Sequence, residues 1–266
     1  MEKNLKINTE KAGNYVNILG IKVLSTSLSH VLTSVREDIT HSKKFYILTP
    51  NPELILASTK NDDLKTALNS ATYSVPDGVG LNYASKFLFG KTINTIPGRK
   101  LFVELITLAN KKGWKVFFLG GTGKEAEKAA ENLKINYKRI KIEAFAGPAV
   151  DNNGQPAKEE DKKLQMEAVA KINKFSPELL FVAFGNPKQE IWIYKNLKSL
   201  NVGGAMAVGG TLRYIAGESR LPPVWMERTG LEWLWRLVTE PHRFGRVFNA
   251  LIVFTLRVFW FKITGL

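Results

Sequence analysis

Apolar residues along this chain form short continuous runs, which alternate with longer stretches of helical periodicity. Continuous apolar runs are typical of strands buried on both faces of a parallel sheet. They cover residues 15–23, 45–49, 114–120, 141–146, 179–185 and 205–209, with a shorter run at 71–75. Helical patterns lie between them, at 27–39, 52–58, 81–89, 100–111, 124–133, 162–173 and 188–200. This alternation predicts a doubly wound α/β sheet.

The pattern changes after Arg220, where Pro222–Pro223 precedes a segment rich in Trp, Phe and Arg. We therefore expect an α/β core over residues 1–219 and a basic, aromatic, helical appendage over 220–266. Its apolar run at 247–261 is shorter than the roughly 20 residues needed to span a bilayer. Basic flanks and interfacial aromatics favour a helix lying on an anionic membrane surface. A core helix, or the interface of a homo-oligomer, is the alternative.

Polar side chains follow two of the expected strands, at the edge where doubly wound sheets bind ligands. Thr49 and Asn51 come directly after the run at 45–49, although Asn51 can equally cap the helix that starts at Pro52. Asp77 follows the run at 71–75 and precedes Gly78. A carboxylate there can act as a general base, with glycines allowing a substrate to approach closely. An ordinary turn at Asp-Gly is the alternative.

Glycines follow three other strands, and their backbone N–H groups can bind a phosphate or sugar. Gly120 begins a glycine-rich turn that lacks the full dinucleotide-binding and P-loop spacings. Gly185 precedes a helix whose first turn contains Gln189, a residue that helix capping does not explain. Gly209 and Gly210 follow the last run. A tight strand-to-helix turn explains the first of these motifs equally well.

The amino-acid composition limits the classes of partner that the protein can bind. The net charge of +14 indicates a polyanion, which can be a nucleic acid, a phosphorylated substrate or an anionic membrane. No nucleic-acid-binding module is recognisable, so we expect no nucleic-acid partner. The absence of cysteine excludes disulfides and thiolate zinc sites, and residues 1–15 lack a signal peptide's apolar core, so a cytoplasmic location is expected. The three histidines lack ligand spacing and no Asp-x-Asp is present, so no metal is expected. Arg228 and Arg236 can instead clamp a diphosphate.

Taken together, the motifs resemble the WecG/TagA/CpsF glycosyltransferase family. The similarity runs from about residue 15 to about 246. The matching pieces are Thr49-Pro50-Asn51, Pro76-Asp77-Gly78-Val79-Gly80, Pro97-Gly98, Phe118-Leu119-Gly120, Gly185-Asn186-Pro187-Lys188-Gln189-Glu190, Val208-Gly209-Gly210, Ala216-Gly217, Arg220-Leu221-Pro222, 230–237 and Glu240-Pro241-His242-Arg243.

This resemblance implies a Rossmann-like core and an inverting, metal-independent transfer. It implies a UDP-N-acetylmannosamine-type donor and a polyprenyl-diphosphate-linked GlcNAc acceptor, used in cell-surface polysaccharide or teichoic-acid-linkage synthesis on the inner face of the cell membrane. Asp77 would match the proposed base, Thr49 and Asn51 would lie beside it, and Gln189 would match a site glutamine. The appendage would cover the site and bring its arginines, Arg220 included, to the UDP diphosphate.

Three positions depart from the family pattern. Thr95 replaces an arginine, Lys100 an aspartate and Arg213 part of a Phe-Asp pair, while Arg99 is placed to substitute for the missing arginine. The added positive charge suits a donor with a carboxylate, such as a uronic acid. A catalytically altered homologue, and a nucleotide-binding dehydrogenase suggested by 120–123, are the remaining alternatives.

Overall fold

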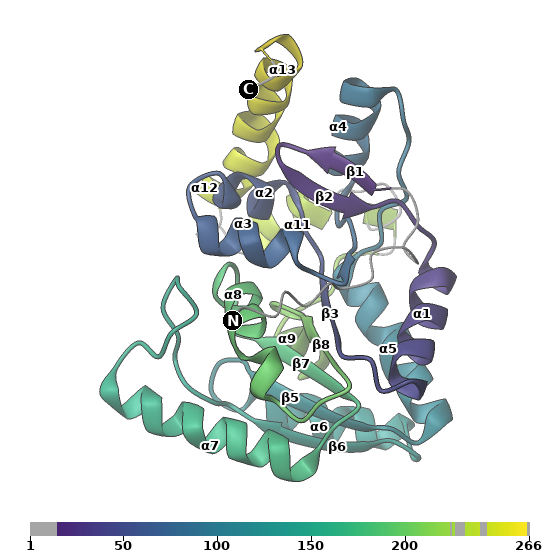
Figure 1. Ribbon diagram of the computed structural model, residues 1–266, viewed down its shortest axis with the longest axis vertical. Coiled ribbons are helices and arrows are strands. Elements are labelled where there is room, and N and C mark those ends of the chain that lie inside the picture. Colours follow the sequence, from purple (N-terminus) through teal and green to yellow (C-terminus); the bar gives the residue numbers. More distant parts are fainter. Residues whose placement is uncertain (1–14, 224, 227–231, 240–243, 265–266) are drawn as a thin grey trace, which may run out of the picture.

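The computed structural model describes residues 15–223, 225–226, 232–239 and 244–264. Within them, six strands form a parallel sheet in the order β4-β3-β8-β7-β5-β6 (Figure 1). The strands are β3 (Phe45–Leu48), β4 (Tyr73–Ser74), β5 (Lys115–Gly120), β6 (Lys141–Phe145), β7 (Leu179–Ala183) and β8 (Gly204–Ala207). The predicted α/β fold is confirmed.

One predicted strand, 15–23, is wrong as a single element. It is an antiparallel hairpin of β1 (Tyr15–Ile18) and β2 (Ile21–Leu24), outside the six-stranded sheet. The chain reverses at Leu19 and Gly20, whose φ angles of 49° and 84° fall in the left-handed region that tight two-residue hairpins require.

Successive residues of the central strands face opposite sides of the sheet and enter two separate cores. On β5, Phe117 and Leu119 pack into the core that also contains the hairpin, whereas Val116 and Phe118 pack into the other. Because both faces are covered, β7 and β8 are buried at every position, and β5 is buried at every position after Lys115. The molecule therefore has three layers, with the sheet between two layers of helices.

Helices α2 (Pro52–Ser58), α3 (Asp62–Asn69), α7 (Glu159–Phe175) and α8 (Lys188–Asn196) contribute to the first core. Helices α1 (Leu28–Thr40), α5 (Gly98–Lys112), α6 (Glu125–Asn136) and α9 (Thr211–Ile215) contribute to the second. Helix α4 (Val79–Phe89) follows β4, and a 3₁₀ turn at Leu197–Ser199 follows α8. Helix α3, capped by Asn61, is an element that the sequence patterns did not predict.

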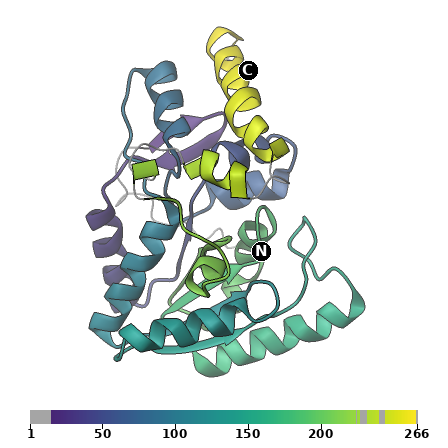
Figure 2. The ribbon, with the colours of Figure 1, turned by 180° about the vertical axis from the view of Figure 1, so that it is seen from behind.

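The described part of the segment 220–266 contains α11 (Glu232–Thr239), α12 (Phe244–Phe248), a π-helical stretch (Asn249–Val253) and α13 (Phe254–Thr264). Residues Phe244–Thr264 form a single helix of 21 residues, which by length and composition alone is long enough to cross a membrane. The helix extends past both ends of the apolar run at 247–261, and it is therefore longer than the run that we expected to be too short to span a bilayer. We call it the C-terminal helix. Figures 1 and 2 place α13 beside α4 at one end of the molecule, and the two helices are in contact.

Candidate functional site

A cavity of about 1030 Å³ lies where several strands of the sheet end. Its lining includes Thr49 after β3, Asp77 after β4, Gly185 after β7 and Gly209 after β8. Since carboxyl ends of parallel strands meet at one edge, residues up to 160 positions apart converge there. The structure thus brings the strand-end motifs 49–51, 76–80, 185–190 and 208–210 together in one site, including Gly78 and Gly210.

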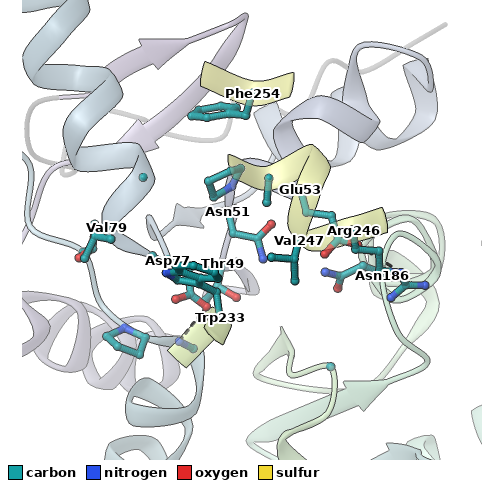
Figure 3. A pocket seen from close by; sticks show the side chains of 18 of the residues that line it. Thr49, Asn51, Glu53, Asp77, Val79, Asn186, Trp233, Arg246, Val247 and Phe254 are labelled. Carbon is teal, nitrogen blue, oxygen red and sulfur yellow. Dashed lines mark hydrogen bonds and ion pairs between the residues drawn. The ribbon is translucent and has the colours of Figure 1, made fainter. Parts of the chain in front are cut away.

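Asp77 is half-buried and is fixed from two sides. Its backbone N–H donates to the carbonyl of Pro50 at 2.8 Å, and its Oδ2 accepts a hydrogen bond from the backbone N–H of Gly98 at 3.2 Å. Gly98 is the first residue of α5, so the carboxylate lies at the N-terminal, positive end of a 15-residue helix, where acidic side chains are commonly found. A Cβ on Gly98 would lie only 3.1 Å from Thr49 Oγ1. Glycine therefore lets Thr49 and Asp77 stay close together, as Figure 3 shows.

Asn51 acts as a helix cap and also lies in the cavity, so both interpretations of its sequence position hold. It caps α2, because its Oδ1 accepts a hydrogen bond from the N–H of Leu54 at 2.9 Å. It also lines the cavity beside Asp77 (Figure 3). Capping uses Oδ1 alone, so the Nδ2 amide group is the part of this side chain suited to bind a ligand.

Gln189 is 2% exposed and joins the loops that follow β7 and β8. Its Oε1 accepts hydrogen bonds from the N–H groups of Gly185, at 3.2 Å, and Gly209, at 3.0 Å. Its Nε2 donates to Asn186 Oδ1 and to Glu190 Oε1 at 2.9 and 2.8 Å. These four bonds use the polar capacity of the amide within the protein. Gln189 therefore shapes the cavity floor, although it also forms part of the lining.

Glu190, the next residue, is a buried carboxyl group behind this floor. Burial raises its pKa to about 7, and the negative charge of Glu53 adds to the rise, while the hydrogen bond from Gln189 opposes it. Among the described residues, its Oε2 atom has no hydrogen-bond partner. Helix-dipole preference alone, the explanation that its place in the first turn of α8 suggests, does not account for a fully buried carboxyl.

Three arginines, Arg99, Arg213 and Arg246, line the cavity and make it suitable for an anionic ligand. Arg246 Nε lies 3.6 Å from Glu53 Oε1, and Arg213 Nε lies 3.7 Å from Glu125 Oε1. Lys100 is exposed and is absent from the described lining, so it does not add to the charge of the cavity. The case for a carboxylate-bearing donor, which was based on Lys100 and Arg213, then depends on Arg213.

Several predicted site residues lie elsewhere or outside the description. Gly120 is not among the described lining residues; it packs against β7, where an added Cβ would lie 2.8 Å from the carbonyl oxygen of Ala183. Arg220 is exposed and also absent from that lining. Arg228 lies outside the described residues, and of Arg236 the structure describes only the backbone position on α11. Their expected role at a diphosphate stays a prediction.

The cavity also has lining residues that were not among the candidate site residues, although Asn186 and Trp233 lie inside the matching motifs. Glu53, Asn186, Trp233 and Arg246 surround the polar part (Figure 3). An apolar part continues between α4 and the C-terminal helix. Only the helical pattern of 81–89 and the apolar run at 247–261 pointed to these elements, and neither says which helices pack together. In the described ranges, His, Asp and Glu side chains do not gather in groups of three or more that could hold a metal ion.

Known proteins of similar sequence identify the family to which this chain belongs. Residues 16–265 match the model of the glycosyl transferase WecG/TagA/CpsF family. Similar proteins include an N-acetylglucosaminyldiphosphoundecaprenol N-acetyl-beta-D-mannosaminyltransferase of Bacillus spizizenii, 30% identical over 227 residues, which are 85% of this chain and 82% of that protein. A Staphylococcus aureus protein of the same name is 30% identical over 235 residues, 87% of each chain. With nearly the whole sequence matched, this chain belongs to the WecG/TagA/CpsF family of glycosyltransferases.

Proposed function

We propose that this glycosyltransferase moves an N-acetylmannosamine-type sugar from UDP to a polyprenyl-diphosphate-linked GlcNAc acceptor. The relatives at 30% identity carry names that describe this transfer, and the match covers most of each chain. The observation that carries the proposal is the position of Asp77, a helix-anchored carboxylate in a cavity lined by three arginines.

In the proposed reaction, a hydroxyl oxygen of the acceptor attacks the anomeric carbon of the donor sugar. The new C–O bond forms on the face opposite UDP, while the bond between the anomeric carbon and the diphosphate oxygen breaks. Asp77 accepts the hydroxyl proton, and UDP leaves with the bonding electron pair. The configuration at the anomeric carbon is therefore inverted.

Negative charge grows on the diphosphate as UDP leaves, so cationic groups stabilise the transition state. Arg246 and Arg213 line the cavity and can supply this charge, together with the backbone N–H groups at the strand ends. Each guanidinium group can donate two parallel hydrogen bonds to phosphate oxygens. Arginines can therefore stabilise the charge of the leaving diphosphate in place of a divalent cation. On this basis we propose a metal-independent transfer.

The Asp77→Asn variant tests the role of the carboxylate. The amide keeps the size of the side chain and its acceptor oxygen toward Gly98 but cannot take a proton at neutral pH. We expect turnover to fall at least about a hundredfold, while UDP binding, measured by calorimetry, stays unchanged. Asp62→Asn, the same substitution at an exposed position of α3, is the matched control and should be fully active. Near-wild-type turnover of Asp77→Asn would remove this residue from the role of base.

We also propose that the protein works in the cytoplasm, on the inner face of the cell membrane. The support is the C-terminal helix, whose exposed apolar residues include Leu256, Phe259, Trp260 and Ile263. Sedimentation with vesicles that contain anionic lipid tests this location. Protein that stays in the supernatant under these conditions would contradict it.

A further inference from the structure

We propose that the apolar part of the cavity binds the first isoprenoid units of the lipid-linked acceptor. This inference rests on the proposed function, because it assigns the acceptor's lipid a place in the same cavity. We call this part the prenyl arm and define it by its lining on two elements. Helix α4 provides Val79, Tyr83, Ala84 and Phe87, and the C-terminal helix provides Val247, Ala250, Leu251, Phe254, Thr255, Val258 and Phe259.

The two walls of the prenyl arm are held at a fixed separation by contacts at their far end. The rings of Phe87 and Phe259 stack with their centroids 6.1 Å apart. Lys262 Nζ donates a hydrogen bond to the carbonyl of Leu88 at 2.6 Å, which satisfies a carbonyl in the last turn of α4. Phe254 and Val258 anchor the second wall in the core of the protein. The arm is therefore a built groove between two packed helices.

The arm is continuous with the catalytic end of the cavity. Helix α4 begins two residues after Asp77, so its first turn starts beside the proposed base. From Val79 to Phe87 the helix advances about 12 Å, at about 1.5 Å per residue. Figure 3 shows Phe254 of the opposite wall on the far side of Asn51 from Asp77. An acceptor whose sugar hydroxyl reaches Asp77 can thus extend its chain along α4.

The chemistry of the lining selects a hydrocarbon over the nucleotide. The hydroxyl of Thr255 donates to the carbonyl of Leu251 in its own helix, so its proton is not available to a ligand. Tyr83 supplies the other side-chain hydroxyl among the described residues of the arm. A uracil ring there would leave most of its polar groups unpaired, which is unfavourable in an apolar groove. A prenyl chain has no such groups and gains from leaving water.

The prenyl arm lies at one end of the molecule, and this position also favours a lipid as its ligand. Large apolar side chains of α13, including Trp260 and Ile263, are exposed around the outer end of the arm. Figures 1 and 2 show α4 and α13 extending together from the body of the protein. A chain that leaves the arm at this end therefore continues along an apolar surface.

The experiment measures transfer to GlcNAc-diphosphate esters of increasing chain length. The esters carry a methyl group, two isoprene units or four, and are used below their micelle concentrations without detergent or membranes. We expect kcat/KM of the wild-type protein to rise with chain length. Phe87→Ser should lower kcat/KM about tenfold for the four-unit ester and leave the methyl ester unchanged. Tyr83→Ser, at an exposed position of the same wall, should act in the same direction.

Phe89→Ser is the matched control. It makes the same substitution on the same helix, at a residue that is 43% exposed and absent from the described lining, against 49% for Phe87. Its response to chain length should equal that of the wild type. Equal losses in Phe87→Ser and Phe89→Ser would overturn the proposal, because a general apolar surface would then explain the effect.

Other outcomes separate this inference from the proposed function. Wild-type transfer that is equally efficient with all three esters would overturn the prenyl arm and leave the transferase activity intact. Absence of transfer to every ester would contradict the proposed function. The prenyl arm is then tested by binding of farnesyl diphosphate, which Phe87→Ser should weaken and Phe89→Ser should leave unchanged. A dimer in sedimentation velocity that Phe87→Ser dissociates would show instead that a second copy occupies the arm.

Discussion

Glu190 makes the stability of this protein depend on pH in a direction opposite to that of most carboxylates. Burial raises its pKa from the ordinary value of 4.5 to about 7 in the folded state. Between these values the folded chain holds a proton that the unfolded chain has released. The contribution of this group to stability is therefore complete below about pH 4.5 and is lost as pH rises through 7.

Glu190→Gln isolates this effect, because the amide is neutral at every pH and has nearly the same shape. A pKa that moves from 4.5 to about 7 corresponds to about 3 kcal/mol, most of which, about 2 to 3 kcal/mol, falls between pH 5 and pH 8. We expect the variant to gain this much stability relative to the wild type over that range. The gain arises because the wild type must ionise a buried group and the variant does not.

Urea unfolding of both proteins at pH 5, 6, 7 and 8 measures the difference directly, and other titrating groups cancel in it. Glu167→Gln is the matched control, since Glu167 is half exposed and paired with Lys171 on the surface of α7. Its difference from the wild type should vary little with pH. A difference between Glu190→Gln and the wild type that stays constant from pH 5 to pH 8 would refute the reasoning.

Two further predictions concern the polar end of the cavity. Gly98→Ala places a Cβ 3.1 Å from Thr49 Oγ1 and 3.5 Å from Asp77 Oδ2. We therefore expect steady-state turnover to fall about tenfold, with little change in unfolding by urea. Unchanged turnover would show that both side chains adjust freely. Arg246→Gln should raise the KM for the UDP-sugar about tenfold, while its loosely paired, half-exposed contact with Glu53 adds less than about 1 kcal/mol to stability. Arg246→Lys keeps the charge and should recover part of the affinity, and equal KM values for both variants and the wild type would contradict a donor-binding role.

The sheet was predictable because its central strands are buried on both faces and so appear as unbroken apolar runs. The same criterion failed for 15–23, where a reversal at Leu19 and Gly20 lies inside one apolar stretch. Helix α3 escaped prediction because it is short: its buried residues Leu64, Ala67 and Leu68 have helical spacing but cover little more than one turn. A continuous apolar run thus predicts a single strand well only when the strand is buried on both faces along its whole length.

The catalytic end of the site was predictable for a topological reason. Parallel strands bring their carboxyl ends to one edge, so motifs after β3, β4, β7 and β8 had to meet. The opposite wall was not predictable in this way, because nothing local records that α4 packs against a helix more than 150 residues later in the chain. Likewise, Gln189 stood out as a polar residue without a local partner, but its partners lie on two separate loops.

The amide of Gln189 has a consequence for how this protein can tolerate substitutions. One side chain satisfies the backbone of two glycine loops, so a substitution that moves either loop disturbs the other through the shared oxygen. Changes in the two loops should then show strong epistasis, with double replacements tolerated where each single one is not. A new substrate preference would accordingly require a pair of substitutions, one in each loop. The protein with only one of the two would bind either substrate poorly.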